Sequence, residues 1–243
     1  MKLKIKNISL NYQRYGNQEG QSLVLLHGWG QNIDMMKPIG DKFTKDFDVI
    51  IFDLPGFGNS SEPKEFWSCY DYVELIKLAL DELNVSNPII VGHSFGGKLG
   101  LIYASKYEVK KLVCLASPFC KEIKKPTLKV RLLKMLKKIP ILNKMENFVK
   151  RHMGSTDYRN ASGIMRDILV GHVNLDIKED VKKIKCSTLL IWGTLDEAVN
   201  IERAYELEKL IKDAGLVVYD GCTHYAYLER LGQTINVLRS FFS

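Results

Sequence analysis

Short runs of apolar residues alternate with segments of helical periodicity along most of the chain. The runs have the length of buried strands and hold few polar residues, as strands covered on both faces do. They span residues 22–26, 48–52, 88–91, 111–116, 188–192 and 216–219. The segments with helical periodicity cover residues 71–83, 98–106, 201–212 and 231–242. This alternation predicts an α/β fold with a mostly parallel central sheet and helices on both faces.

The first 15 residues alternate polar and apolar side chains on either side of Asn7, which predicts an antiparallel hairpin. The same alternation is unlike a signal peptide, which needs an unbroken apolar stretch. No segment of the chain approaches the ~18 apolar residues of a membrane span. We therefore expect a cytoplasmic protein without a transmembrane helix.

A long central segment departs from the strand and helix rhythm. Residues 128–139 have leucine and isoleucine on one face and lysine and arginine on the other, and Pro140 ends this amphipathic helix. No buried strand is predicted around it. We therefore predict a helical cap, or lid, inserted at residues 118–183 between the two parts of an α/β core, residues 1–117 and 184–243.

Composition narrows the class of protein. Of the 243 residues, 46% are hydrophobic and 26% are charged, as in an ordinary globular protein. The five cysteines are odd in number and lack C-x-x-C spacing, so neither a disulfide framework nor a zinc site is indicated. We predict reduced thiols, no bound metal and no cofactor.

The net charge of +7 is concentrated in one segment. Residues 121–151 hold eleven basic residues against Glu122 and Glu146, a local charge of +9 that leaves about −2 for the rest. The predicted cap is therefore basic and the core is not. No nucleic-acid motif accompanies these lysines, so we do not expect nucleic-acid binding.

Residues 92–96 read Gly-His-Ser-Phe-Gly between a predicted strand and a predicted helix. Glycines there allow a turn sharp enough to hold Ser94 in a strained conformation with its hydroxyl clear of the sheet. The helix N-terminus behind it favours developing negative charge. The pentapeptide also fits a tight packing turn or an anion-binding turn, so the rest of the chain must decide.

Candidate functional residues follow several predicted strands at their carboxyl ends, the edge where α/β sheets bind ligands. They are Trp29, Ser94, Asp196 and His224. A hydroxyl, an imidazole that takes its proton and a carboxylate that orients the imidazole are the groups that nucleophilic catalysis requires. The backbone N–H groups of Trp29 and Phe95 are candidates for the two donors of an oxyanion hole.

Five segments in this order resemble the α/β-hydrolase superfamily over almost the whole chain. They are residues 27–30, 53–60, 92–97, 193–196 and 221–224, with Leu228 and Glu229 beyond. The resemblance implies that Ser94 is the nucleophile, His224 the general base and then acid, and Asp196 its orienting carboxylate. It also implies that Trp29 and Phe95 supply the oxyanion N–H groups. We expect Trp29 and Phe119 to contact the substrate.

Other polar residues near these motifs have simpler interpretations. Glu197 rivals Asp196 as the orienting acid, but the spacing from the glycine at 193 favours Asp196. His27 is expected to fix neighbouring loops by hydrogen bonds, His93 to pack, and Asp53 to head a rigid loop under the site. The two histidines of the cap segment, His152 and His172, are predicted to be surface or lid residues.

The loops are most similar to those of small carboxylesterases, including carrier-protein methyl-ester esterases. The leading hypothesis is a cofactor-independent serine esterase that forms and hydrolyses an acyl-enzyme on Ser94. Carbon–carbon bond hydrolysis, a lyase reaction and perhydrolase activity are alternatives on the same residues, because fold does not determine function. A ligand receptor with slow turnover is a further alternative.

The basic cap suggests three roles. Its lysines could steer an acidic partner such as an acyl carrier protein. Its amphipathic helix could lie on anionic lipid, as in a lipase-like hydrolase acting at a membrane surface. In the simplest case, the apolar face covers the acyl pocket and the lysines keep the cap hydrated.

Overall fold

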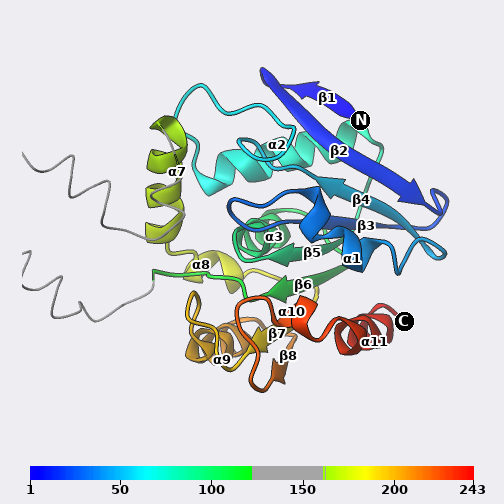
Figure 1. Ribbon diagram of the computed structural model, residues 1–243, viewed down its shortest axis with the longest axis vertical. Coiled ribbons are helices and arrows are strands. Elements are labelled where there is room, and N and C mark those ends of the chain that lie inside the picture. Colours follow the sequence, from blue (N-terminus) through cyan, green and yellow to red (C-terminus); the bar gives the residue numbers. More distant parts are fainter. Residues whose placement is uncertain (122–160, 162) are drawn as a thin grey trace, which may run out of the picture.

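The computed structural model describes residues 1–121, 161 and 163–243 of the chain. Its centre is an eight-stranded sheet in the order β1-β2-β4-β3-β5-β6-β7-β8 (Figure 1). The strands are β1 (Lys2–Ile5), β2 (Ile8–Gly16), β3 (Gln21–Leu26), β4 (Phe47–Phe52), β5 (Ile89–His93), β6 (Lys111–Leu115), β7 (Ser187–Gly193) and β8 (Ala214–Tyr219). Strands β4, β3, β5, β6, β7 and β8 are parallel to one another. The predicted mostly parallel sheet is confirmed, with strand bounds within about two residues of those expected.

The predicted N-terminal hairpin is also confirmed. Strand β1 pairs antiparallel with β2, and β2 pairs antiparallel with β4 at the edge of the parallel sheet. The two turn residues, Lys6 and Asn7, both have positive φ angles, 45° and 64°. Two consecutive positive φ angles are typical of the tight turn whose twist matches that of a hairpin. Asparagine at the second of these positions tolerates the left-handed region well.

Helices cover both faces of the sheet, as the sequence predicts (Figure 1). One apolar core lies between the sheet and α2 (Cys69–Glu82), α3 (Phe95–Lys106), α7 (Gly163–Asn174) and α9 (Ile201–Leu210). The second lies under η1 (Ile33–Met35), α1 (Lys37–Gly40), α10 (Ala226–Glu229) and α11 (Leu231–Phe242). Successive residues of a central strand serve opposite cores: Val24 belongs to the first and Leu25 to the second. This explains why the strands are continuous apolar runs.

Some helices were missed or mislocated at the sequence level. The short elements η1, α1 and α10 have three or four residues, too few to produce a helical period. Helix α3 begins at Phe95, three residues before the predicted start at Lys98, because Gly96 and Gly97 weaken the helical pattern. Tertiary packing explains why Gly96 and Gly97 occupy the first turn of this helix, since both glycines are buried.

Part of the predicted cap is described. It contains α7 and the short helix α8 (Lys178–Val181), which both contribute to the first core. The predicted basic helix over residues 128–139 and His152 lie outside the described residues, so the cap boundaries stay a prediction. Within the described part of the chain, no helix is long and apolar enough to cross a membrane.

Candidate active site

The turn between β5 and α3 holds Ser94 in a conformation that few residues adopt. Its φ and ψ angles are 49° and −111°, and its backbone N–H donates to Leu115 O at 2.9 Å. A Cβ atom on Gly92 would lie 2.5 Å from Gly96 O, and one on Gly96 would lie 2.3 Å from Leu26 O. No larger residue fits at either position. The strain at Ser94 is thus maintained by close backbone packing, as the sequence motif implies.

The backbone N–H groups of Phe95 and Trp29 have no hydrogen-bond acceptor among the residues that the structure describes. Phe95 is the first residue of α3, so its N–H has no acceptor within the helix. Trp29 lies in the loop after β3, with its ring 5.3 Å from the Phe95 ring. Among the described residues, neither N–H donates a hydrogen bond. The two N–H groups predicted as oxyanion donors are thus not engaged by another group in the described part of the chain.

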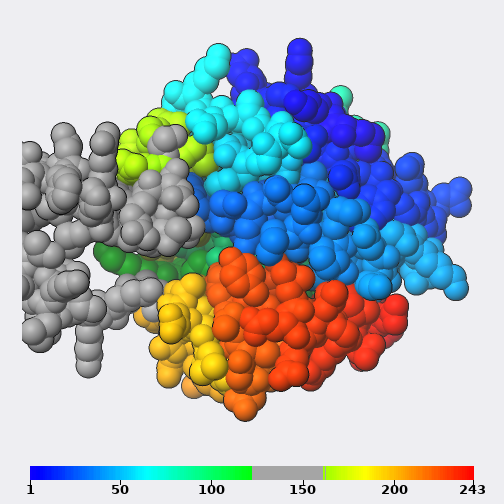
Figure 2. Space-filling view, viewed as in Figure 1, coloured from blue at the N-terminus to red at the C-terminus, as the bar shows by residue number. Residues whose placement is uncertain are grey.

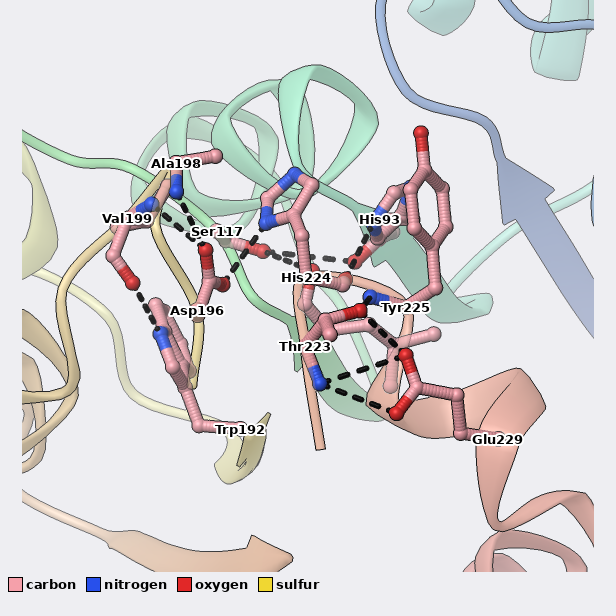
Figure 3. A network of polar contacts seen from close by, with 12 residues as sticks. His93, Ser117, Trp192, Asp196, Ala198, Val199, Thr223, His224, Tyr225 and Glu229 are labelled. Atoms are coloured by element: carbon pink, nitrogen blue, oxygen red, sulfur yellow. Dashed lines mark hydrogen bonds and ion pairs between the residues drawn. The ribbon is translucent and has the colours of Figure 1, made fainter. Parts of the chain in front are cut away.

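Asp196 and His224 are brought together by the loops after β7 and β8. His224 Nδ1–H donates to Asp196 Oδ2 at 2.8 Å. The other carboxylate oxygen, Oδ1, accepts from the N–H groups of Ala198 and Val199, each at 2.8 Å (Figure 3). The Asp196 side chain is fully buried and that of His224 is 17% exposed. The carboxylate against His224 is thus Asp196, which the spacing favoured over Glu197, and it is held in one orientation.

The loop that carries His224 is fastened on both sides. Glu229 accepts hydrogen bonds from the Thr223 N–H, at 3.0 Å to Oε2, and from the Thr223 hydroxyl (Figure 3). On the other side, His93 Nε2–H donates to the backbone oxygen of His224 at 3.1 Å. Sequence reasoning missed the role of Glu229, although the residue belongs to a motif segment. Its position six residues after Thr223 has no spacing rule that would reveal it.

A pocket of about 810 Å³ opens over these residues. Ser94, His224 and Trp29 all line it, so the structure places the predicted nucleophile, base and oxyanion residue at one cavity. Phe119 does not line it. Its side chain is fully buried in the first core, and the pocket is lined by the preceding and following residues, Pro118 and Cys120.

Contrary to the prediction, Phe119 is not among the residues that line the pocket and lies behind them in the first core. An aromatic residue after a buried strand suits either environment, and only the path of the chain decides between them. Cys120, which the sequence suggested only as a reduced thiol, does line the pocket.

Two of the other histidines have structural partners, as predicted. His27 Nε2 accepts from the Leu54 N–H at 2.9 Å while its Nδ1–H donates to Gly28 O at 2.7 Å. Asp53 accepts from the N–H groups of Ile33 and Asn59 and so ties its loop together. Burial lowers the pKa of His27 to about 4 and that of His93 to about 3. Both rings are neutral near pH 7.

His172 was predicted to be a surface or lid residue; it is not at the surface, but it does lie in the described part of the predicted cap. It is 6% exposed, belongs to α7 and lines the pocket. Its ring stacks on that of Trp29, with the centroids 6.1 Å apart and the planes 4° apart. A lone histidine in a segment without strand signals offered no indication of this contact.

We searched the described residues for a possible metal site. Within the described residues, no group of three or more His, Cys, Asp or Glu side chains is placed to hold a metal ion. The five cysteines all lie in the described part of the chain and are free thiols.

Known proteins resemble this chain over most of its length. The alpha/beta hydrolase fold family matches residues 21–130. Lipase 3 of a Moraxella species is 26% identical over 98% of this chain and 84% of that lipase. The pimeloyl-(acyl-carrier protein) methyl ester esterase of Aliivibrio fischeri is 24% identical over 93% of this chain and 95% of that esterase.

Solved structures agree on the fold. The enol-lactonase of Burkholderia xenovorans superposes with a TM-score of 0.76 and 20% identity, covering 100% of this chain and 99% of that one. At this identity the likeness concerns the fold alone. Together with the family match over residues 21–130 and the named hydrolases among its relatives, it shows that the chain has the α/β-hydrolase fold and is a hydrolase.

Proposed function

We propose that the chain hydrolyses carboxylic esters through an acyl-enzyme on Ser94. The observation that carries the proposal is the hydrogen bond of 2.8 Å between His224 Nδ1 and Asp196, beside a pocket that Ser94 also lines. A buried carboxylate on Nδ1 keeps that nitrogen protonated. The lone pair of the imidazole is then on Nε2, where it can accept the Ser94 proton.

The first half of the reaction forms the acyl-enzyme. Ser94 Oγ attacks the ester carbonyl carbon while His224 Nε2 takes the hydroxyl proton. The carbonyl oxygen becomes an oxyanion, and the N–H groups of Trp29 and Phe95 donate to it. When the tetrahedral intermediate collapses, the C–O bond to the alcohol breaks and the alcohol leaves with the proton from His224.

The second half releases the acid. A water molecule gives a proton to His224 Nε2 and attacks the acyl carbonyl, again with the oxyanion held by the two N–H groups. Collapse returns the proton to Ser94 Oγ and frees the carboxylic acid. Asp196 stabilises the imidazolium in both halves without taking the proton itself.

Esters are favoured over other substrates by two kinds of support. The relatives that match most of the chain include a protein named as a lipase and one named as a methyl ester esterase. The pocket also has aliphatic and aromatic members, among them Leu169, Val173 and Leu195, which suit an acyl chain. Docking of an acidic carrier protein or anionic lipid on the basic segment 121–151 stays a proposal, because that segment beyond Lys121 lies outside the described residues.

The proposal is tested with p-nitrophenyl esters from acetyl to palmitoyl. We expect hydrolysis with an optimum at short or medium chains, and a loss of about 10⁴-fold or more in kcat for Ser94→Ala. A matched control is Ser105→Ala on the same helix, whose hydroxyl donates to Ile102 O and should be dispensable for activity. Labelling by an organophosphonate should be lost in Ser94→Ala and retained in Ser105→Ala.

The alternative chemistries predict other results. If no ester is cleaved in a Ser94-dependent way and the phosphonate does not label the protein, the esterase proposal is wrong. A lyase or receptor then becomes the better interpretation, and ligands that raise the melting temperature would identify it. Labelling of Ser94 without ester turnover would point to carbon–carbon bond hydrolysis or perhydrolase chemistry.

A further inference from the structure

His172 is placed against both residues that carry the oxyanion N–H groups. Its ring stacks on Trp29 and meets the Phe95 ring edge-on, with centroids 4.6 Å apart and planes at 69°. It comes from α7, outside the α/β core motifs, yet it lines the same pocket as Ser94. A ligand that reaches Ser94 in this pocket therefore shares the cavity with this imidazole.

The imidazole of His172 is neutral. Burial and the nearby Lys98 cation lower the pKa of His172 well below its ordinary value. Its Nδ1 faces Cys69 Sγ at 3.7 Å, and burial raises the pKa of Cys69 to about 11, so this partner is an uncharged thiol. The ring nitrogen left for the pocket is Nε2. His172 therefore offers a hydrogen bond to a ligand, not a charge.

Lys98 explains why His172 is held in this position. It lies one turn after Ser94 on α3 and is fully buried. Its ammonium donates to His172 O at 2.9 Å and to Leu175 O at 2.8 Å, at the C-terminal end of α7. Helix C-termini carry partial negative charge, which compensates a buried cation. Helix α3, which follows the predicted nucleophile, is thus hydrogen-bonded through Lys98 to the turn of α7 that carries His172.

A second contact of α7, with the segment before α2, supports this position of His172. A Cβ atom on Gly171 would lie 2.9 Å from the tip of the Phe66 side chain, so the Phe66 ring packs directly against α7 at this residue. In the space-filling view, the yellow-green surface of α7 lies directly against cyan residues of the segment before α2 (Figure 2). Helix α7 is thus held at its C-terminal end by Lys98 and packs against Phe66 one residue before His172.

We propose that His172 is a specificity residue that hydrogen-bonds an oxygen substituent on the acyl part of the ester, a few bonds from the carbonyl, and that Lys98 positions it. The inference rests on the proposed esterase function. A hydroxyl both donates and accepts, so it matches either tautomer of a neutral imidazole. The structure thus favours hydroxyacyl esters over plain acyl esters of the same shape.

The test compares two esters of equal shape, p-nitrophenyl 3-hydroxybutyrate and p-nitrophenyl 3-methylbutyrate. We expect the wild type to prefer the hydroxy ester by about tenfold in kcat/KM, the order of one buried hydrogen bond that the analogue leaves unmade. His172→Phe keeps an aromatic ring for Trp29 and Phe95 but removes both nitrogens. It should reduce the preference to within about twofold while its melting temperature shows that it is folded.

Val170→Ala is the matched control, since Val170 is on the same helix, is 42% exposed and does not line the pocket. It should retain the wild-type preference. If the wild type shows no preference, or His172→Phe retains it, the specificity role is wrong. If neither ester is cleaved in a Ser94-dependent way, the proposed function itself has failed, and this inference falls with it.

Lys98 is tested by the same ratio. Lys98→Met removes the two hydrogen bonds to α7 and should weaken the preference for the hydroxy ester, mainly through a higher KM. A purely structural lysine would instead lower the activity on both esters equally, and that result would overturn its positioning role. Should Lys98→Met not fold, Lys98→Gln, which still reaches one carbonyl, is measured in its place and should show an intermediate preference.

Discussion

Two buried carboxylates lie at opposite ends of the parallel strands. One is paired with an arginine and the other with a histidine. At the edge where the parallel strands begin, Asp48 accepts from Arg14 Nε and Nη2 at 3.0 and 2.9 Å and from the Ser22 hydroxyl. At the edge where they end, Asp196 accepts from two backbone N–H groups and from His224. Both side chains are almost completely buried, at 1% and 0% exposure.

The difference between them lies in the partner. A guanidinium is permanently charged and its bidentate contact holds β2 against the start of β4. An imidazole can gain and lose a proton near neutral pH, and its second nitrogen is free to serve another group. The same kind of buried acid therefore joins two strands where the parallel strands begin and orients an imidazole where they end. Substitutions at the two edges test this contrast.

The largest expected effect is on activity at the carboxyl edge. Asp196→Asn keeps the shape of the side chain but no longer requires a proton on His224 Nδ1, so the wrong tautomer becomes accessible. We expect kcat on a p-nitrophenyl ester to fall on the order of 10⁴-fold. An unchanged kcat would show that Asp196 only supports the loop, and Glu197→Gln is the neighbouring control.

The corresponding substitution of Asp48, where the parallel strands begin, should lower the free energy of unfolding instead of the activity. Asp48→Asn leaves the Arg14 cation without its charged partner, and breaking a buried pair of this kind costs on the order of 3 kcal/mol. Arg14 is 22% exposed, which reduces the penalty below that of a fully buried cation. Urea unfolding should report the loss, with kcat of the folded fraction preserved. A fall in kcat at full stability would contradict the contrast.

Buried histidines at the carboxyl edge should make the fold sensitive to mild acid. An unfolded histidine has a pKa near 6.5, whereas the pKa values of His27 and His93 are lowered to about 4 and 3. As the pH falls from 7 to 5, these two histidines become protonated in the unfolded chain but stay neutral in the folded chain. The free energy of unfolding therefore decreases between pH 7 and 5. The loss is on the order of 2 kcal/mol for each of the two histidines.

Urea unfolding at pH 7 and pH 5 measures this loss. His93→Gln should show a smaller decrease in the free energy of unfolding than the wild type, because one of the two histidines that are protonated only in the unfolded chain is removed. Identical decreases in both proteins would mean that His93 is accessible to protons in the fold. With pKa values of about 4 and 3, neither His27 nor His93 titrates in the folded chain between pH 5 and 8, so neither accounts for a change of activity in that range.

The smallest expected effect concerns the fastening of the His224 loop. Glu229→Gln keeps an acceptor for the Thr223 N–H but removes the negative charge. The hydrogen bonds from Thr223 hold the pKa of Glu229 below its usual range, so the ionised form is the one that fastens the loop. We expect kcat to fall by less than about tenfold, within the range of one charge-assisted hydrogen bond. Exposed Glu202→Gln is the control and should match the wild type.

Local sequence determined the architecture and the identity of the chemical groups. Strands covered on both faces must be apolar throughout, so each could be recognised from its own sequence without knowledge of the strands beside it. The turn around Ser94 depends on glycines within four residues of it, and the order of strand ends brought Asp196 and His224 to the same edge. Each of these features is set by residues close together in the chain or by the general topology of parallel sheets.

Tertiary structure alone decided which residues line the pocket. Whether Phe119 or its neighbours faced the cavity depended on the path of the chain after β6, and Phe119 proved to be core. The position of His172 depends on Lys98, 74 residues earlier, and on the ring of Trp29, which is still farther away in sequence. Contacts of this range have no periodicity or spacing in the sequence, because they arise only when separately formed elements pack against one another.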